Sequence, residues 1–190
     1  MKRIKSPSPN FSSRNGFKPE LVVVHCTEGH FPTDLEYLRN PNPGGSVGPV
    51  SAHFLIAPNG DIHELVDVAN TAWHAGRVMN PTVPLKPGIN PNLYSIGIET
   101  SVKPGGNATP EQLISLKELV RGLGTKYTIP LDRNHVIGHR DIFSAKVCPG
   151  TINIYDILDK TPELKVEPKK PSKKEKRRIW ALILRMLKSK

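Results

Sequence analysis

The sequence predicts an α/β fold in which a central mixed β-sheet is flanked by helices. Short apolar runs rich in β-branched residues, such as residues 21–25 (LVVVH), indicate buried strands. The turn sequence Pro-Asn-Gly-Asp at 58–61 separates two such runs, which is typical of a β-hairpin. A capped segment with helical periodicity at 109–124 follows the strand segment at 94–100. Strands that alternate with helices along a chain are typical of the α/β class.

The strands and helices are expected in a definite order. Apolar runs bounded by Gly, Pro, Asn and Asp indicate the strands, and apolar residues three or four apart indicate the helices. The predicted strands are residues 21–25, two within 51–67, 94–100 and 135–139, and the predicted helices are 33–40, 109–124 and 153–160. The Pro-rich segments 40–49 and 78–92 are predicted loops, and a loop as long as the second is commonly functional.

The helix at 109–124 has the clearest predicted boundaries. Thr109 is a suitable N-cap residue, Pro110 takes the first helical position, and Gln112 takes the capping-box position. Gly124 fits a C-cap that ends the helix. Between these ends the apolar residues fall at helical spacing: Leu113, Leu116, Val120 and Leu123.

One domain, at residues 20–160, is expected between two polar ends. Residues 1–19 are basic and rich in Pro, Ser and Asn, which predicts a flexible arm. This arm lacks the apolar centre of a secretory signal, so export by the usual signal route is not expected. Residues 161–172 form a predicted Pro/Lys linker, and residues 173–190 a predicted basic amphipathic helix. Two cysteines in 190 residues are too few for a disulfide framework.

The positive charge is concentrated at the C-terminal end. The chain carries a net charge of +10, and 12 of its 27 Lys and Arg residues lie within residues 160–190. Because the rest of the chain is nearly neutral, nucleic-acid binding would depend on this end alone and is not favoured. In the predicted helix an apolar stripe opposes the cationic face, which favours an anionic membrane or envelope surface as its partner. The alternative is a helix that packs on the domain or on another subunit.

Three residues form a candidate zinc site. His25 and His139 each end a predicted strand, and Cys148 follows nine residues after His139. Imidazole and thiolate both suit zinc, and three protein ligands leave a fourth position for water, as in catalytic sites. By spacing alone this trio is a weak signal, because a histidine at a strand end is ordinarily a partly buried polar side chain.

The other histidines and the second cysteine are expected to be structural. Cys26 is predicted to be a small buried residue that points away from the side chain of its neighbour. His53 is predicted to be a structural histidine bonded at the sheet edge. Three further histidines are predicted on the surface or at the edge of the core: His30, His63 and His135.

Five motifs together resemble the zinc-dependent N-acetylmuramoyl-L-alanine amidases, a family that includes peptidoglycan recognition proteins and phage lysins. These motifs are VVVHCTEG, SAHFLIAPNGDIHELVD, AWHAG, SIGIET and VIGHRDIFSAKVCPG, and they occur in the family's order across residues 20–157. The resemblance implies that residues 20–160 are an amidase domain with zinc in a groove at the surface of its sheet. It also implies that the chain cleaves the amide between N-acetylmuramic acid and L-alanine.

The resemblance assigns roles to individual positions. It implies Zn²⁺ ligation by His25, His139 and Cys148. Glu99 matches the glutamate that acts on the zinc water, and Lys146 matches the catalytic lysine. His74 matches a groove-lining position, and Trp73 could belong to the core or to the groove wall. With Thr27 these two residues are the candidate substrate-binding positions. Some relatives carry a tyrosine where this chain has Ala52, so acid–base work by a tyrosine there is excluded and Glu99 gains importance.

Several functional alternatives stay open at this level. The chain could be a non-catalytic peptidoglycan-recognition module, although such relatives usually lack a zinc ligand that is present here. As an enzyme it could be a phage-type lysin, made in the cytoplasm and released to the cell wall, or a cytoplasmic amidase that recycles muropeptides. The basic C-terminal segment favours the lysin. Peptidoglycan or muropeptides are the expected partners, and the chain is expected to be a monomer.

Overall fold

The computed structural model describes residues 2–43 and 48–159, so the linker and amphipathic helix predicted for 161–190 lie outside the described residues. The strands are β1 (Arg3–Lys5), β2 (Phe11–Ser13), β3 (Leu21–Cys26), β4 (Phe54–Ile56), β5 (Ile62–Glu64), β6 (Asn70–Ala72), β7 (Ser95–Thr100) and β8 (Val136–Gly138). The helices are α1 (Thr33–Arg39), the 3-10 helix η1 (Pro91–Tyr94), α2 (Pro110–Tyr127), α3 (His139–Ile142) and α4 (Ile154–Leu158). Among the helices within these ranges, none has the length and apolar character needed to cross a membrane.

The prediction of a central mixed sheet is confirmed. Six strands form one sheet in the order β1-β5-β4-β7-β3-β8, and a separate antiparallel pair joins β2 to β6. The pairs β4–β7, β7–β3 and β3–β8 are parallel, and only β4–β5, the predicted hairpin, is antiparallel within the sheet. The carboxyl ends of three neighbouring strands therefore meet at one edge, the usual place for a site in such a sheet.

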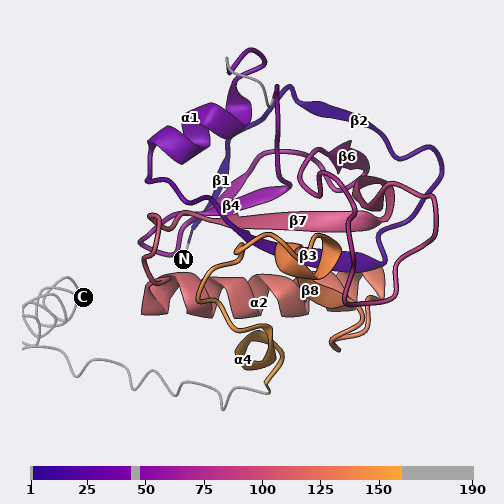
Figure 1. Ribbon diagram of the computed structural model, residues 1–190. Helices are drawn as coiled ribbons and strands as arrows, with labels where there is room; N and C mark the ends of the chain where they lie inside the picture. Colours follow the sequence, from indigo (N-terminus) through magenta and orange to yellow (C-terminus); the bar gives the residue numbers. More distant parts are fainter. Residues whose placement is uncertain (1, 44–47, 160–190) are drawn as a thin grey trace, which may run out of the picture. The chain divides into compact units, whose positions relative to one another are not determined.

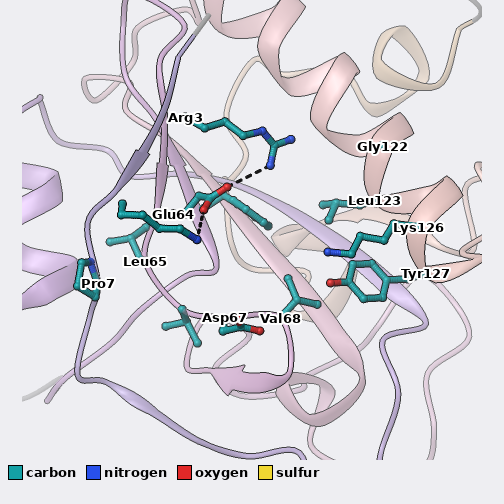
Figure 2. A pocket seen from close by; sticks show the side chains of 13 residues that line it. Arg3, Pro7, Glu64, Leu65, Asp67, Val68, Gly122, Leu123, Lys126 and Tyr127 are labelled. Carbon is teal, nitrogen blue, oxygen red and sulfur yellow. Dashed lines mark hydrogen bonds and ion pairs between the residues drawn. The ribbon is translucent and has the colours of Figure 1, made fainter.

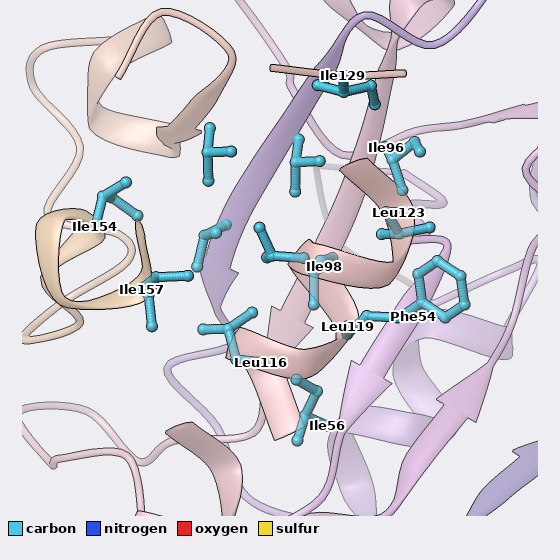
Figure 3. Packing of buried hydrophobic residues seen from close by; sticks show 14 of the residues in the cluster. Phe54, Ile56, Ile96, Ile98, Leu116, Leu119, Leu123, Ile129, Ile154 and Ile157 are labelled. Atoms are coloured by element: carbon cyan, nitrogen blue, oxygen red, sulfur yellow. The ribbon is translucent and has the colours of Figure 1, made fainter. Parts of the chain in front are cut away.

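The two faces of the sheet are covered differently. Alternate residues of a strand point to opposite faces, so Val22 and Val24 of β3 face one side while Val23 and His25 face the other. On the first face α2 and α4 pack against the sheet, with Leu116, Leu119 and Ile157 in a cluster that includes Val22 and Val24 (Figure 3). Figure 1 shows α2 on this side of the sheet and α1 on the other. The second face carries polar residues, and the site lies there.

The predicted C-cap at Gly124 is wrong. Helix α2 continues to Tyr127 and is capped by Thr128, whose φ of 57° is left-handed. Gly124 lies inside the helix, where the segment that follows the helix passes close to it. A Cβ atom at this position would lie 2.7 Å from Cδ2 of Leu131, so the glycine allows close packing. The capping box of Thr109 and Gln112 at the start of the helix is confirmed.

The prediction that residues 1–19 form a flexible arm is also wrong. Strand β1 pairs in parallel with β5 and completes one edge of the sheet, and β2 pairs with β6. Residues 2–159, apart from the undescribed segment 44–47, belong to one compact unit. These two strands are short and mostly exposed, and they pair with their neighbours through the main chain. They lack the apolar alternation by which a strand is predicted from the sequence.

Arg14 fastens the N-terminal segment to the domain. Its side chain is buried, and it donates to the main-chain oxygens of Val68 at 2.7 Å, Leu93 at 2.8 Å and Ser95 at 2.9 Å. Burial lowers the pKa of Arg14 to about 10, so the side chain stays charged at neutral pH. The Arg14 guanidinium therefore joins the N-terminal segment to two other parts of the chain, Val68 and residues 93–95.

We expect Arg14→Met to lower the free energy of unfolding by at least about 3 kcal/mol, because it leaves several buried carbonyl groups without a donor. Urea unfolding followed by circular dichroism measures this change. The control is Arg3→Met, which removes an exposed ion pair with Glu64 and should cost less than about 1 kcal/mol. Equal small effects of the two substitutions would contradict the anchoring role of Arg14.

Candidate metal centre

The sheet register brings three predicted site residues together. His25 lies directly opposite Glu99 in the parallel pair of β3 and β7. Val24 lies opposite Gly138 in the pair of β3 and β8, and His139 is the next residue, where it begins α3. The two histidines are 4.7 Å apart between ring centroids. The grouping follows from strand order, which the sequence alone does not reveal.

His25, His139 and Cys148 place their ligand atoms within 4.8 Å of one another. The Nδ1 atom of His25 lies 3.7 Å from Sγ of Cys148. His25 and Cys148 are buried, and His139 is partly exposed, so the cluster is open on one side. Two imidazoles and one thiol are a donor set that suits zinc, and the open side leaves room for a further ligand.

The histidines are in the protonation state that a cation requires. Burial lowers the pKa of His25 well below its ordinary value, and the positive charges of His139 and Lys146 act in the same direction. Burial also lowers the pKa of His139, again with a contribution from Lys146. Both rings are therefore neutral at pH 7 and have a free electron pair for a metal.

Cys148 is held in place by Cys26. The main-chain N–H of Cys26 donates to Sγ of Cys148 at 3.3 Å, and the two side chains share an apolar cluster with Val102. The contact with the Cys26 thiol and burial raise the pKa of Cys148. A bound cation reverses such a shift, because it stabilises the thiolate directly. Cys26 is buried, as predicted.

Glu99 lies beside this cluster with an unsatisfied oxygen. Its Oε1 is 3.9 Å from Nδ1 of His25, and its Oε2 is buried with no hydrogen-bond partner. Burial, together with the charges of Cys26 and Asp34, raises the pKa of Glu99 to about 8. A carboxyl group of this kind can both accept and return a proton near neutral pH.

The raised pKa of Glu99 makes the metal-free protein sensitive to alkali. Between the ordinary value of 4.5 and about 8 the folded protein holds a proton that the unfolded chain releases, so stability falls as pH rises through this window. We expect Glu99→Gln to remove this fall and to stabilise the metal-free protein at pH 8 by a few kcal/mol. Thermal unfolding from pH 5 to 9 in chelator checks this, and parallel curves for both proteins would contradict it.

The cluster lies in a cavity of about 180 Å³. Trp73, Lys146 and Val147 line it together with the three ligand residues and Glu99. Lys146 and Val147 are exposed, and Val147 exposes 64% of its surface. The cavity therefore offers a charge, a carboxyl group and an apolar wall around the candidate cation position.

The three predicted substrate positions are placed differently. Trp73 lines the cavity and donates from Nε1 to Oγ of Ser12 at 3.2 Å. His74 also lines the cavity, and its two ring nitrogens contact His25 and Ser95. Thr27 lies outside the cavity lining, and its hydroxyl donates to the buried Asp34 at 2.8 Å.

The remaining histidines are outside the ligand cluster, as predicted. His53 is buried, and its Nδ1 accepts from the main-chain N–H of Gly97 at 3.0 Å. His63 lies 2.9 Å from Oγ of Ser6, and His135 lies 2.6 Å from Asp132. Burial lowers the pKa of His53 to about 3, so this ring is a neutral structural group.

The sequence gives no signal for the residues that support the site. Asn92 accepts at Oδ1 from the main-chain N–H groups of both His74 and Ala75, at 3.1 and 2.8 Å. Ser95 lies 3.1 Å from Nε2 of His74. Both are small polar residues, Asn92 in η1 and Ser95 at the start of β7, and only their burial identifies them.

A larger cavity of about 430 Å³ lies on the opposite face of the sheet, between β1, β5 and α2 (Figure 2). Its charged groups largely pair with one another, since Arg3 and Lys5 both contact Glu64. The only described cluster of three or more potential metal ligands is at the smaller cavity. The chemistry of the molecule is therefore concentrated at the edge formed by β3, β7 and β8.

Comparisons of the sequence with protein families and with individual proteins indicate the same family. A family model described as N-acetylmuramoyl-L-alanine amidase matches residues 15–151. The 1,6-anhydro-N-acetylmuramyl-L-alanine amidase AmpD of Haemophilus influenzae is 35% identical over 102 residues, which are 53% of this chain and 52% of the relative. The match thus spans about half the length of that curated relative.

Solved structures share the fold. The crystal structure of a selenomethionine derivative of AmpD has a TM-score of 0.67 at 27% identity, over 83% of this chain and 93% of that chain. AmiD from E. coli, in complex with anhydro-N-acetylmuramic acid-L-Ala-D-gamma-Glu-L-Lys, has a TM-score of 0.55 at 26% identity, over 71% and 52% of the two chains. The amidase LysC from Clostridium intestinale, at 23% identity and a TM-score of 0.58 over 83% and 95%, supports the fold alone.

Proposed function

The chain belongs to the N-acetylmuramoyl-L-alanine amidase family, and from this we propose that it hydrolyses the amide between N-acetylmuramic acid and the L-alanine of the stem peptide. One observation carries the proposal. The ends of three neighbouring parallel strands bring two neutral histidines, a cysteine and a carboxyl group with a raised pKa into one open cavity. A site that only recognised peptidoglycan would need neither the donor set nor the poised carboxyl group.

His25, His139 and Cys148 are the proposed zinc ligands. When bound, zinc supplies Lewis-acid polarisation of the scissile carbonyl and lowers the pKa of water. The protein supplies neutral imidazoles, a thiol fixed by Cys26 and a position open to the cavity. These features match a catalytic zinc site, in which three protein ligands leave one position free.

Glu99 and Lys146 are the proposed catalytic residues. Glu99 lies next to the ligand cluster and can take a proton from the attacking water and return it to the leaving amine. Lys146 lines the same cavity and can stabilise the negative charge that develops on the carbonyl oxygen. Because Ala52 stands where some relatives have tyrosine, no tyrosine at that position shares the proton transfer.

The proposal predicts zinc-dependent release of new amino termini. Full-length protein loaded with zinc should free the L-alanine amino group from purified peptidoglycan or from a soluble muropeptide, and chelator should stop the reaction. Mass spectrometry of the products identifies the bond that is cut. Binding of muropeptide by the zinc-loaded protein without any new amino termini would support a recognition module and contradict the enzyme.

The substrate form separates two biological roles. The relative from Haemophilus influenzae acts, by its name, on a 1,6-anhydro substrate, which favours soluble muropeptides and recycling in the cytoplasm. The basic end at residues 160–190 favours a lysin that acts on the cell wall after release. We favour the lysin, and comparison of rates on intact sacculi and on anhydro-muropeptides decides the question.

The proposed lysin role includes membrane contact by residues 173–190. Co-sedimentation of the full chain with anionic vesicles should exceed that with neutral vesicles, because the predicted helix opposes a cationic face to an apolar stripe. A chain that ends at residue 160 is the control and should sediment with neither. Equal weak binding to both kinds of vesicle would count against membrane recognition.

A further inference from the structure

The two histidine ligands of the candidate metal centre share one supporting segment, residues 73–76. Nε2 of His25 lies 3.0 Å from Nδ1 of His74, and Nε2 of His139 lies 3.1 Å from the main-chain oxygen of Ala75. His74 and Ala75, which are adjacent in the chain, thus each contact one of the two histidines at Nε2. Such outer partners orient a ligand ring and decide which of its nitrogens carries hydrogen.

The partner of His139 permits one tautomer. A main-chain carbonyl can only accept, so Nε2 of His139 carries the hydrogen and donates it to Ala75. Nδ1 then has a free electron pair. His139 is therefore prepared to bind a cation through Nδ1.

His25 requires the same tautomer, and its partner can select it, because the ring of His74 accepts at Nδ1 when its own hydrogen is on Nε2. Its Nδ1 faces the site, at 3.7 Å from Sγ of Cys148 and 3.9 Å from Oε1 of Glu99. Binding through Nδ1 places the hydrogen of His25 on Nε2, where it is donated to Nδ1 of His74. His74 then carries its own hydrogen on Nε2 and donates it to Oγ of Ser95, at 3.1 Å.

We propose that His74 is a positioning residue that holds His25 in the tautomer whose Nδ1 binds zinc. The chain of hydrogen bonds runs from Ser95 through His74 to His25, and each group has a partner of the right kind. The inference rests on the proposed function, because it assumes that His25 is a zinc ligand. It gives His74 a role different from the substrate contact implied by the family resemblance.

The residues around His74 enclose its ring and fix its position. His74 is 9% exposed, and both ring nitrogens are occupied by protein groups, so neither is left for a substrate. The ring packs against Gly97, where a Cβ atom would lie 2.4 Å from Cγ of His74. Asn92 fixes the main chain of the segment through two hydrogen bonds to one oxygen.

Zinc affinity of the full-length chain tests the proposal. His74→Leu removes the acceptor and should weaken zinc binding about 10- to 100-fold in competition with a chromophoric chelator. His74→Asn keeps an acceptor, because its Oδ1 is attached to Cγ as Nδ1 is, and should recover at least about tenfold of that loss. The matched control is His63→Leu. His63 is a buried histidine on β5, three positions from β3 in the sheet order, and its replacement should leave zinc affinity unchanged.

Zinc affinity of His74→Leu equal to that of the unchanged protein would overturn the proposal. A second measurement does not depend on the folding of any variant. Nitrogen-15 spectra of the imidazole rings in the unchanged, metal-free protein should show His25 and His74 with hydrogen on Nε2. Hydrogen on Nδ1 of His25 would also overturn it. Failure of the unchanged protein to bind zinc while the ring spectra are as expected would instead contradict the proposed function.

Discussion

Replacing Cys148 by serine is expected to abolish tight zinc binding and to lower the rate of amide hydrolysis by more than about 100-fold. The loss of a direct ligand should exceed the 10- to 100-fold effect of losing a partner that only orients one. Serine is nearly the same size as cysteine, but its hydroxyl does not ionise near neutral pH and is a poor ligand for zinc. Zinc content after dialysis and the release of L-alanine amino groups measure the two effects.

The carboxylate variant is the matched test of this expectation. Aspartate is a competent zinc ligand, so Cys148→Asp should retain metal and part of the activity that Cys148→Ser loses. The thermal unfolding of metal-free Cys148→Ser should resemble that of the unchanged chain, because the serine hydroxyl can accept from the main-chain N–H of Cys26 as Sγ does. Full activity of Cys148→Ser would show that the cluster is not the catalytic metal site.

The sequence predicts the main elements well because their signals are local. Residues 21–25 form a buried strand because a β-branched apolar run has no other place in a domain of this size. The start of α2 is fixed by Thr109 and Gln112, whose hydrogen bonds form within one helical turn. The end of α2 was mistaken because Gly124 is explained by packing against Leu131, a contact that no local pattern encodes.

The candidate site is predictable in part for the same reason. Resemblance to a family implies the candidate ligands, but the meeting of His25 with Glu99 and His139 depends on strand order. The support that His74 receives from Ser95 and Asn92 depends on burial and on hydrogen-bond geometry. Arg14 was placed in a flexible arm because a charged residue among Ser and Asn is ordinarily exposed. Its burial depends on carbonyl groups of Val68 and of residues 93–95, which are far from it in the sequence.

Glu99→Gln is expected to lower kcat by about 10²- to 10⁴-fold while zinc content stays the same. Glutamine has the shape of glutamate but cannot accept the proton of the attacking water. The effect should appear in kcat more than in KM, since Glu99 lies beside the candidate ligand cluster and its proposed role is to act on the reacting water. The combination of retained metal and lost turnover separates Glu99 from the ligand Cys148, whose replacement removes both.

The pH dependence gives this expectation a second, independent outcome. In the unchanged enzyme the rate should rise with pH as Glu99 loses its proton. This rise should occur below pH 8, because a bound cation stabilises the carboxylate and so lowers its pKa from the metal-free value of about 8. The residual activity of Glu99→Gln should lack this rise. The matched control is Glu118→Gln on the exposed side of α2, which should retain both the rate and its pH dependence. A general base ordinarily contributes more than a tenfold acceleration. If the rate of Glu99→Gln stays within about tenfold of that of the unchanged enzyme, another group must take the proton.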